Sequence, residues 1–425
     1  MLLWVAQAIS QTAQNAIWYG LLVLVETRSQ SSTQMSLAIL TLLVPSVLFG
    51  IVAGAYVDRW DKRAVLIGTN ALRAVVTLGY IVFAPEPGGQ ELHRLGLIYA
   101  VNFVFSTIGQ FFAPAEAAII PAIVPRHRLL QANSMFHLTF TTSQLVGIVL
   151  LGPLVFKLAG ETGLFGLIAA LFAVCAILVW PLPRGSGGLA AEVEQARSLS
   201  GLWSDIRELW SFMRRDPLVR LAVGHWTLGA TLGLVIAMLA PGFAVSVLGI
   251  RAEDSVLVLA PAGVGMVLGT VLLGHLGRSI DKHDLINAGL LVVGAALAAL
   301  GLLRPAANLL LRASAGFFEL PAQAPGPWLT ATVMLLALVA GFGFVSVVVA
   351  SQTIIQERAP VAIRGRVFAV QLVLSNAVSI LPLVFLGGVA DLIGVGLTLV
   401  LLGFGILVVD ALTIRAHRRL PLVPA

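Results

Sequence analysis

The sequence is poor in charged residues and has almost no cysteine. Of its 425 residues, only 11% are Asp, Glu, Lys or Arg, whereas soluble domains carry about 25%. The single cysteine, Cys175, has no partner, which excludes a disulfide-stapled scaffold. The chain also lacks a Walker-type phosphate loop, a Cys/His cluster with metal-ligand spacing and a serine nucleophile elbow. We therefore expect no enzyme, no ATP-driven pump, no metal and no bound cofactor.

Apolar residues, in contrast, make up 58% of the chain, and the mean hydropathy is +0.97. Twelve helices that cross a bilayer need about 20 residues each, or roughly 240 apolar-rich positions, and this chain supplies about that number. We therefore predict an all-α polytopic membrane protein with twelve transmembrane helices. The long apolar runs place these spans near 3–25, 35–57, 64–84, 95–120, 132–157, 161–180, 218–248, 255–277, 285–303, 327–355, 365–390 and 393–414.

The basic residues separate into two sets between these spans. Nineteen Lys and Arg residues fall in the C-terminal tail and in one set of alternate loops, and only six fall in the other set. Because basic residues are retained on the cytoplasmic side, this asymmetry predicts that both termini and the long break at 181–217 are cytoplasmic and that the loop at 304–326 lies outside. The net charge of +6 is then explained by topology, and we expect no nucleic-acid partner.

The chain divides into two halves of six helices each. The longest break separates residues 1–180 from residues 218–425, so we predict two six-helix bundles, the second followed by a short cytoplasmic tail. The connecting segment 181–217 begins with a Pro/Gly/Ser-rich stretch and continues with an amphipathic pattern that includes Trp203 and Trp210. This pattern predicts a helix in the inner membrane interface, and a soluble connector helix is the alternative.

The two halves echo each other in sequence. The second span closes with Gly54-Ala-Tyr-Val-Asp58-Arg-Trp-Asp61-Lys62-Arg63, and the eighth closes with Gly274-His-Leu-Gly-Arg278-Ser-Ile-Asp281-Lys282-His283. Gly, Asp and Lys stand in matching positions of the two segments. Repeated halves around a site at the membrane midplane are a transporter architecture.

The segment from Gly54 to Arg63 resembles the signature loop between helices two and three of the major facilitator superfamily, in the branch of the enterobactin exporter and macrolide-efflux proteins. Other family-like residues are Pro45, Ala132-Asn133-Ser134 and the segment from Gln356 to Val367. The resemblance implies a major facilitator fold and a set of gating residues: Gly54, Asp58, Arg59, Asp61, Lys62, Arg63, Arg364, Gly365 and Arg366. It also implies that Asp58 latches the two halves by meeting the N-terminus of helix eleven. A basic loop that only fixes topology is the alternative.

Helix one carries a polar stripe at helical spacing, made of Gln7, Ser10, Gln11, Gln14, Asn15 and Trp18. Since lipid cannot satisfy amide groups, this stripe must face protein or water. Helix seven has Thr227 and Thr231 at the repeat-related positions, next to His225 and Trp226. We interpret both sets as walls of a substrate cavity, with interhelical hydrogen bonding as the alternative.

Three ionisable residues, Arg73, Glu116 and His137, fall inside predicted spans. Charges inside a membrane are costly and often functional. A Glu–His or Glu–Arg pair at this depth could carry a proton or bind a cationic substrate, and a purely structural ion pair is the alternative.

Together these patterns predict a monomeric secondary transporter of the cell inner membrane. We expect it to export small organic molecules by alternating access, with a proton gradient as the expected driving force. A nutrient importer or facilitator, and a non-transporting scaffold or sensor on the same fold, are the alternatives. The amide, hydroxyl and aromatic groups of the predicted cavity suit a neutral or amphipathic substrate better than a compact anion.

Overall fold

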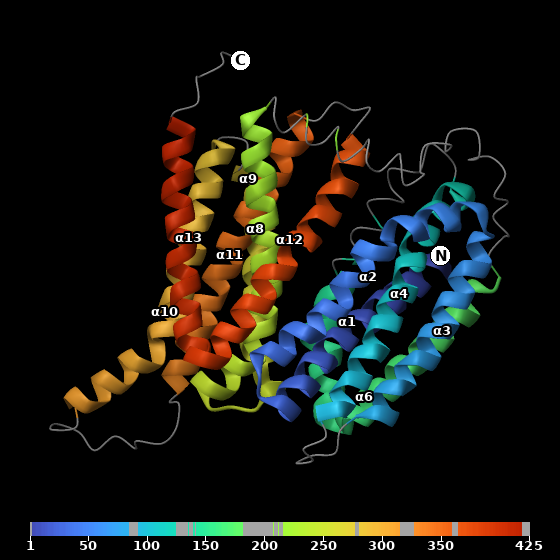
Figure 1. Cartoon of the computed structure of the whole chain (residues 1–425), viewed down its shortest axis with the longest axis horizontal. Coiled ribbons are helices and arrows are strands. Elements are labelled where there is room, and N and C mark those ends of the chain that lie inside the picture. Colours follow the sequence, from blue (N-terminus) through green and yellow to red (C-terminus); the bar gives the residue numbers. More distant parts are fainter. Residues whose placement is uncertain are drawn as a thin grey trace. The chain divides into compact units, whose positions relative to one another are not determined.

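A computed structural model of the chain describes residues 2–84, 92–124, 135, 139–140, 142–181, 207, 211, 216–276, 280–314, 327–358 and 364–418. Helix is the regular secondary structure throughout these ranges (Figure 1). A helix pairs its backbone N–H and C=O groups within itself, which an apolar solvent requires. The sequence pattern and the observed secondary structure therefore agree.

The helices fall into two compact units. The first comprises Met1–Gln30 and Gln34–Ser204, and the second comprises Ser31–Thr33 and Asp205–Ala425. The predicted connector at 181–217 lies almost wholly outside the described residues, so its interfacial helix stays a prediction. The elements of the first unit are α1 (Leu2–Ser29), α2 (Ser32–Arg59), α3 (Lys62–Phe83), α4 (Leu92–Ile123), the π-helix η2 (Val146–Leu151) and α6 (Gly152–Val179).

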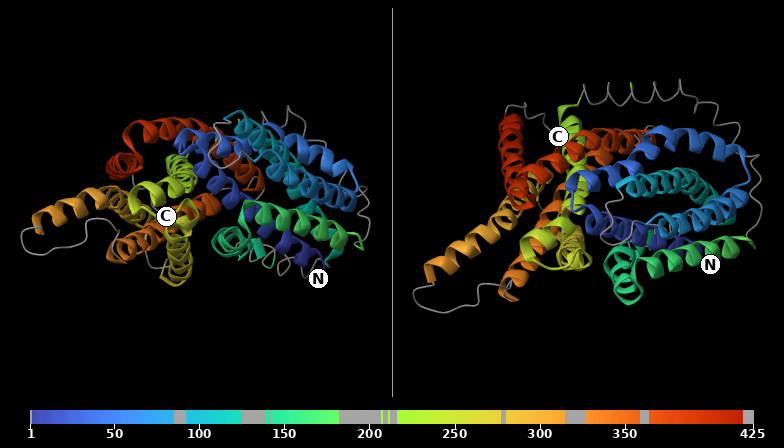
Figure 2. Two further views of the ribbon diagram at one scale, coloured as in Figure 1. Left: turned by 90° about the horizontal axis from the view of Figure 1, so that it is seen from below. Right: turned by 60° about the horizontal axis from the view of Figure 1, so that its bottom comes forward.

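In the second unit, two short irregular helices follow the first long one. Its elements are α8 (Pro217–Phe243), η3 (Ala244–Leu248), η4 (Ala252–Ser255), α9 (Val256–Leu276), α10 (Lys282–Ser314), α11 (Pro327–Arg358), α12 (Arg364–Ile393) and α13 (Val395–Arg418). In the first unit, α3 packs against α4 and α6, and α6 also packs against α1. In the second unit, α11 packs against α9 and α10, and α10 also packs against α13, as the views of Figure 2 show.

Ten segments of the described chain are long and apolar enough to cross a membrane. Helix α1 is not among them because its polar stripe lowers its hydropathy, although its 28 residues span about 42 Å. One of the ten, Thr142–Val179, has 38 residues, far more than the roughly 20 that a single crossing needs. Gly160 interrupts it with a φ of 68°, so this segment holds parts of two successive spans. When α1 is added and this segment is divided in two, the ten segments become the twelve predicted crossings.

Several helices extend beyond the predicted apolar spans. Helix α4 has 32 residues and α10 has 33, which gives each a length near 50 Å against a hydrocarbon core of about 30 Å. The apolar pattern marks the part of a helix that crosses the hydrocarbon. Beyond it the helices continue through polar residues such as His93 and Arg94 at the start of α4 and Arg304 and Arg312 near the end of α10.

The outward-facing side chains of both units are apolar. Leu158 is 78% exposed in the first unit, and Leu381 and Leu392 are 78% and 86% exposed in the second. Many large exposed hydrophobic side chains on one protein mark a surface that faces an apolar environment. This surface is the one expected to face lipid.

A buried polar network holds the middle of α4 against its neighbours. The Tyr80 hydroxyl of α3 donates to Asn102 Oδ1 at 2.7 Å, and Asn102 Nδ2 donates to Thr41 Oγ1 of α2 at 2.7 Å. Tyr80 also stacks on Phe165 of α6, with ring centroids 4.7 Å apart. The network fixes α2, α3, α4 and α6 relative to one another. It lies about two turns of α3 from Arg73 and about four turns of α4 from Glu116, the charged residues described next.

Candidate functional site

Two opposite charges are buried inside the first unit. Arg73 of α3 is 1% exposed and Glu116 of α4 is 2% exposed. Their side chains interact electrostatically. Neither a hydrogen bond nor an ion pair joins them, however, and Arg73 Nε and Nη1 and Glu116 Oε1 have no hydrogen-bond partner in the described part of the chain. Buried charges are normally paired and hydrogen-bonded, so this arrangement is unusual.

Aromatic rings surround the Arg73 guanidinium. Its carbon lies 4.6 Å from the ring centroid of Phe112, 5.4 Å from that of Phe105 and 5.6 Å from that of Phe172. A cation over an aromatic face is attracted by the ring quadrupole, so the three rings partly replace the water that the cation has lost. We call Phe105, Phe112 and Phe172 the aromatic box.

Glycine supplies the remaining space beside the guanidinium. A methyl group at Gly109 would lie 2.8 Å from Arg73 Nη2, closer than such contacts normally are. Phe105, Gly109, Phe112 and Glu116 succeed each other at intervals of three or four residues on α4, so they share one face of that helix. That face meets α3 at Arg73.

The polar stripe of α1 reaches the same region. Gln7, Ser10 and Gln11 are buried, the Ser10 hydroxyl donates to Asn70 Oδ1 of α3 at 3.3 Å, and the Gln11 side chain is a hydrogen-bonding neighbour of Glu116. Gln14, Asn15 and Trp18 are half-buried, and Asn15 Nδ2 donates to the Gln11 carbonyl oxygen at 2.8 Å. The deep part of the stripe thus makes interhelical contacts, and the cavity role of the rest stays a prediction.

Of the three ionisable residues predicted from sequence, the structure brings Arg73 and Glu116 together. His137 lies outside the described residues. Cys175 of α6 lies near both side chains instead. Its thiol donates to the Ala6 carbonyl oxygen of α1 at 3.4 Å, and sequence gave no reason to group it with them.

In the second unit, His225 of α8 is 4% exposed and faces α13. The Thr413 hydroxyl donates to the Val409 carbonyl oxygen at 2.8 Å, so it accepts a hydrogen bond from His225 Nε2, 3.2 Å away. This assignment leaves His225 Nδ1 as an acceptor, and that atom has no hydrogen-bond partner among the described residues. A bare acceptor nitrogen remains inside this unit.

The predicted threonines of α8 lie in a seam of neutral polar side chains. The Thr231 and Ser379 hydroxyls are 2.7 Å apart, Thr231 Oγ1 donates to the Thr227 carbonyl oxygen at 2.9 Å, and Gln371 Nε2 donates to Gln352 Oε1 at 3.4 Å. Sequence reasoning missed the α12 side of this seam. Gln371, Ser375 and Ser379 follow one another at intervals of four residues, so their spacing could have revealed it.

Metal binding receives no support from the described side chains, where no group of three or more His, Cys, Asp or Glu residues could hold an ion.

The repeated signature segments place an aspartate at the start of a helix in each half. Asp61 is the N-cap of α3 and accepts a hydrogen bond from the Arg63 backbone N–H at 3.1 Å. Asp281 precedes α10 and accepts from the His283 backbone N–H at 2.7 Å. An aspartate in this position satisfies an otherwise unpaired donor of the first helical turn. Helix capping therefore explains why both repeated segments have an aspartate at this position.

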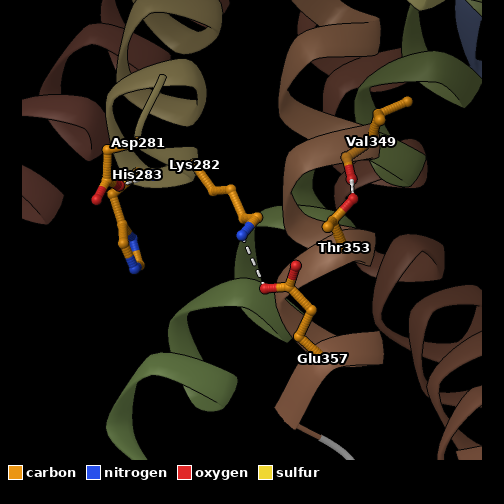
Figure 3. Close-up of polar contacts among 6 residues, drawn as sticks. All are labelled: Asp281, Lys282, His283, Val349, Thr353 and Glu357. Atoms are coloured by element: carbon orange, nitrogen blue, oxygen red, sulfur yellow. Dashed lines mark hydrogen bonds and ion pairs between the residues drawn. The ribbon is translucent and has the colours of Figure 1, made fainter. Parts of the chain in front are cut away.

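The lysines of the two segments differ in their partners. Lys62 Nζ donates to the backbone carbonyl oxygens of Val57 and Trp60, at 2.9 and 3.2 Å. Lys282 Nζ instead binds the Glu357 carboxylate of α11 at 2.8 Å (Figure 3). Lys62 thus stabilises the C-terminal end of α2, and Lys282 ties the start of α10 to the end of α11.

The remaining gating residues are described only in part. Arg63 lies over the Trp180 ring at 5.5 Å, and Arg364 begins α12, in which Gly365 and Arg366 continue the helix. The side chains of Asp58, Arg59, Arg364 and Arg366, and the surroundings of Gly54, lie outside the described residues. The latch role of Asp58 stays a prediction.

Removal of the Asp61 cap should weaken the signature loop. We expect Asp61→Ala to lower the free energy of unfolding by about 1 kcal/mol, because an N-H group of α3 loses its acceptor. Thermal unfolding of the purified protein in detergent measures this loss. Asp61→Asn keeps a capping oxygen and is the matched control, and equal loss in both variants would contradict the capping role.

The whole chain resembles known transporters in sequence and fold. The family model described as the Major Facilitator Superfamily matches residues 3–382. The multidrug efflux pump Tap of Mycolicibacterium fortuitum is 23% identical over 402 residues, 92% of this chain and 89% of that protein. Macrolide efflux protein A of Streptococcus pyogenes is 23% identical over 311 residues, 71% of this chain and 72% of that protein.

Among solved structures, the nucleoside transporter NupG has a TM-score of 0.71 with this chain at 15% identity, and the match covers 99% of this chain and 98% of that one. At such low identity the likeness concerns the fold alone. The comparisons confirm the predicted fold class and the predicted resemblance to macrolide-efflux-type proteins.

Proposed function

The chain belongs to the Major Facilitator Superfamily, and we propose that this transporter exports small organic molecules across the cell membrane. The observation that carries the proposal is the similarity to a multidrug efflux pump along 92% of the chain. The neutral hydroxyl and amide seam of α8 and α12 supports a neutral or amphipathic cargo. Import of a nutrient is the competing function, because the fold itself, which a nucleoside transporter also has, does not set the direction of transport.

We further propose that a proton gradient drives export and that Glu116 carries the proton. Its Oε1 atom is buried and has no hydrogen-bond partner in the described chain, so this oxygen is free to accept a proton. Ionisable groups inside membrane segments are costly and rare, and proton relays are one of the functions they serve. No cofactor beyond the proton is needed for this mechanism.

The cargo class is tested most simply with growth assays. A strain that lacks the gene should become more sensitive to some members of a panel of macrolides and lipophilic cations, and the gene on a plasmid should restore resistance. Unchanged sensitivity to the whole panel, together with reduced growth on a nutrient, would favour import.

The proposed orientation has its own test. Because most basic residues fall on one side, residues 181–217 should face the cytoplasm and 304–326 the outside. In a background without Cys175, a cysteine at Ala322 should react with a membrane-impermeant thiol reagent in intact cells, and one at Ser198 should react only after the cells are broken. The reverse labelling pattern would overturn the orientation.

A further inference from the structure

We propose that Arg73 is a positioning residue for the Glu116 carboxyl group and offers it a second docking point that is used only when Glu116 has lost its proton. This inference rests on the proposed role of Glu116 in proton coupling. We add to that role a second residue, Arg73, and a switch of the Glu116 carboxyl group between two partners, Gln11 of α1 and Arg73 of α3.

Both Arg73 and Glu116 have unpaired polar atoms. Arg73 Nε and Nη1 are donors without acceptors, and Glu116 Oε1 is an acceptor without a donor, all three inside the same unit. A guanidinium can only donate, and its planar fork matches the two oxygens of a carboxylate. Arg73 lies over Phe112, one turn of α4 before Glu116, so donors and acceptor of a possible ion pair lie on neighbouring helices without being joined.

Glu116 has a neighbour on α1 instead, the Gln11 side chain. A glutamine amide has both a donor and an acceptor, so Gln11 of α1 can bind the carboxyl group in either protonation state. Arg73 can bind it well only as a carboxylate. Loss of the proton should therefore move the carboxyl group from α1 towards α3, and gain of the proton should return it to α1.

The guanidinium of Arg73 is held in place by its surroundings. The aromatic box and the space at Gly109 hold the guanidinium where no carboxylate is needed to keep it. An arginine that served only as a structural partner would be expected to close its ion pair. The aromatic box therefore holds the Arg73 guanidinium in position while Glu116 is protonated, ready to bind the carboxylate when the proton leaves.

Other charges near Glu116 are few in the described part of the chain. Helix α3 presents Arg73, α6 presents the Cys175 thiol, and α1 presents the neutral Gln11. The thiol is engaged with the Ala6 carbonyl oxygen. Arg73 is therefore the group in these ranges whose charge favours the carboxylate.

The test compares pH profiles of gradient-driven export in membrane vesicles, using a macrolide or lipophilic cation from the growth assay. Arg73→Gln removes the cation that favours the carboxylate, so the profile should move to higher pH by about one unit or more. Arg73→Lys keeps the charge and should restore most of the profile. A wild-type profile in Arg73→Gln would overturn the inference.

A second variant leaves every charge in place. Gly109→Ala adds a methyl group that the flexible end of Arg73 must avoid, so the helices can still pack while the guanidinium leaves its position. Its pH profile should differ from wild type. Gly96→Ala, on the same helix with open space around it, is the matched control and should keep the wild-type profile.

The variants also separate the inference from the proposal beneath it. Glu116→Gln that still couples export to the gradient would remove the coupling role and this inference with it. Loss of coupling in Glu116→Gln, with wild-type profiles in Arg73→Gln and Gly109→Ala, would overturn the inference alone. If Arg73→Gln fails to insert, the profile of Gly109→Ala decides: a shift supports the role of Arg73 and an unchanged profile overturns it.

Discussion

Glu116→Gln should abolish export driven by a pH gradient and preserve the downhill equilibration of the same compound. The amide has the shape of the protonated carboxyl group and cannot release a proton, so the transporter should behave as if permanently loaded. We expect an imposed pH gradient to add nothing to the transport rate of this variant, because the group that would carry the proton is gone. Transport by everted membrane vesicles, with and without an imposed gradient, measures both quantities.

A matched control removes a carboxylate elsewhere. Glu253, whose partly buried side chain pairs with the exposed Arg251 at 2.9 Å at the start of η4, can be changed to Gln, and we expect full coupling because Glu253 belongs to the second unit and not to the site around Glu116. If Glu116 served only as a structural partner of Arg73, Glu116→Gln should instead reduce the amount of folded protein. Truncation of Arg73 in the same chain should then restore part of it, and this pattern would contradict the coupling role.

Gly341→Ala should strongly destabilise the second unit. A methyl group at Gly341 of α11 would overlap the Ala262 carbonyl oxygen of α9, and one at Gly265 of α9 would overlap the Leu338 carbonyl oxygen of α11. These contacts are with backbone, which cannot rotate away as a side chain can. We expect a loss of about 1–3 kcal/mol in the free energy of unfolding, typical of overpacking in a close-packed interior.

Thermal unfolding of the purified protein measures the effect of Gly341→Ala. Gly388→Ala on α12 is the control, because a methyl group there would meet open space. Equal melting temperatures for the two variants would show that α9 and α11 do not approach as closely as the structure places them.

The fold could be predicted from sequence because its determinants are local. Apolar runs of sufficient length define the helices, and the predicted break between the fifth and sixth spans falls where Gly160 leaves the helical conformation. The ends of the helices could not be predicted as well, because the residues that extend α4 and α10 beyond their predicted spans do not form part of a long apolar run. Asp61 was singled out as a gating residue. The structure shows that it also caps α3, and the gating role stays a prediction.

The candidate site could be predicted only in part, because it depends on how helices pack. Arg73 and Glu116 stood out as charges in apolar segments, and their meeting required α3 and α4 to face each other at one depth. Phe105, Phe112 and Phe172 could not be singled out, since phenylalanines in a membrane helix equally suit contact with lipid. Gly109 likewise gains its meaning only from the Arg73 side chain beside it.

The neutral seam of the second unit, in contrast, could have been found from the sequence. Gln371, Ser375 and Ser379 have the same helical spacing as the stripe of α1, and the same reasoning would have found them. Their side chains are buried, and both Gln371 Oε1 and Ser375 Oγ lack hydrogen-bond partners among the described residues. Hydroxyl groups were given less weight than amides and charges, although each also needs a partner inside a membrane.

The most direct test of the central claim is uptake of a labelled macrolide or lipophilic cation into everted membrane vesicles that contain the protein. An acid lumen should drive accumulation of the compound, a protonophore should abolish it, and vesicles without the protein should show none. Export from the cell corresponds to this direction of uptake. Accumulation that ignores the pH gradient, or that occurs only in right-side-out vesicles, would contradict proton-driven export.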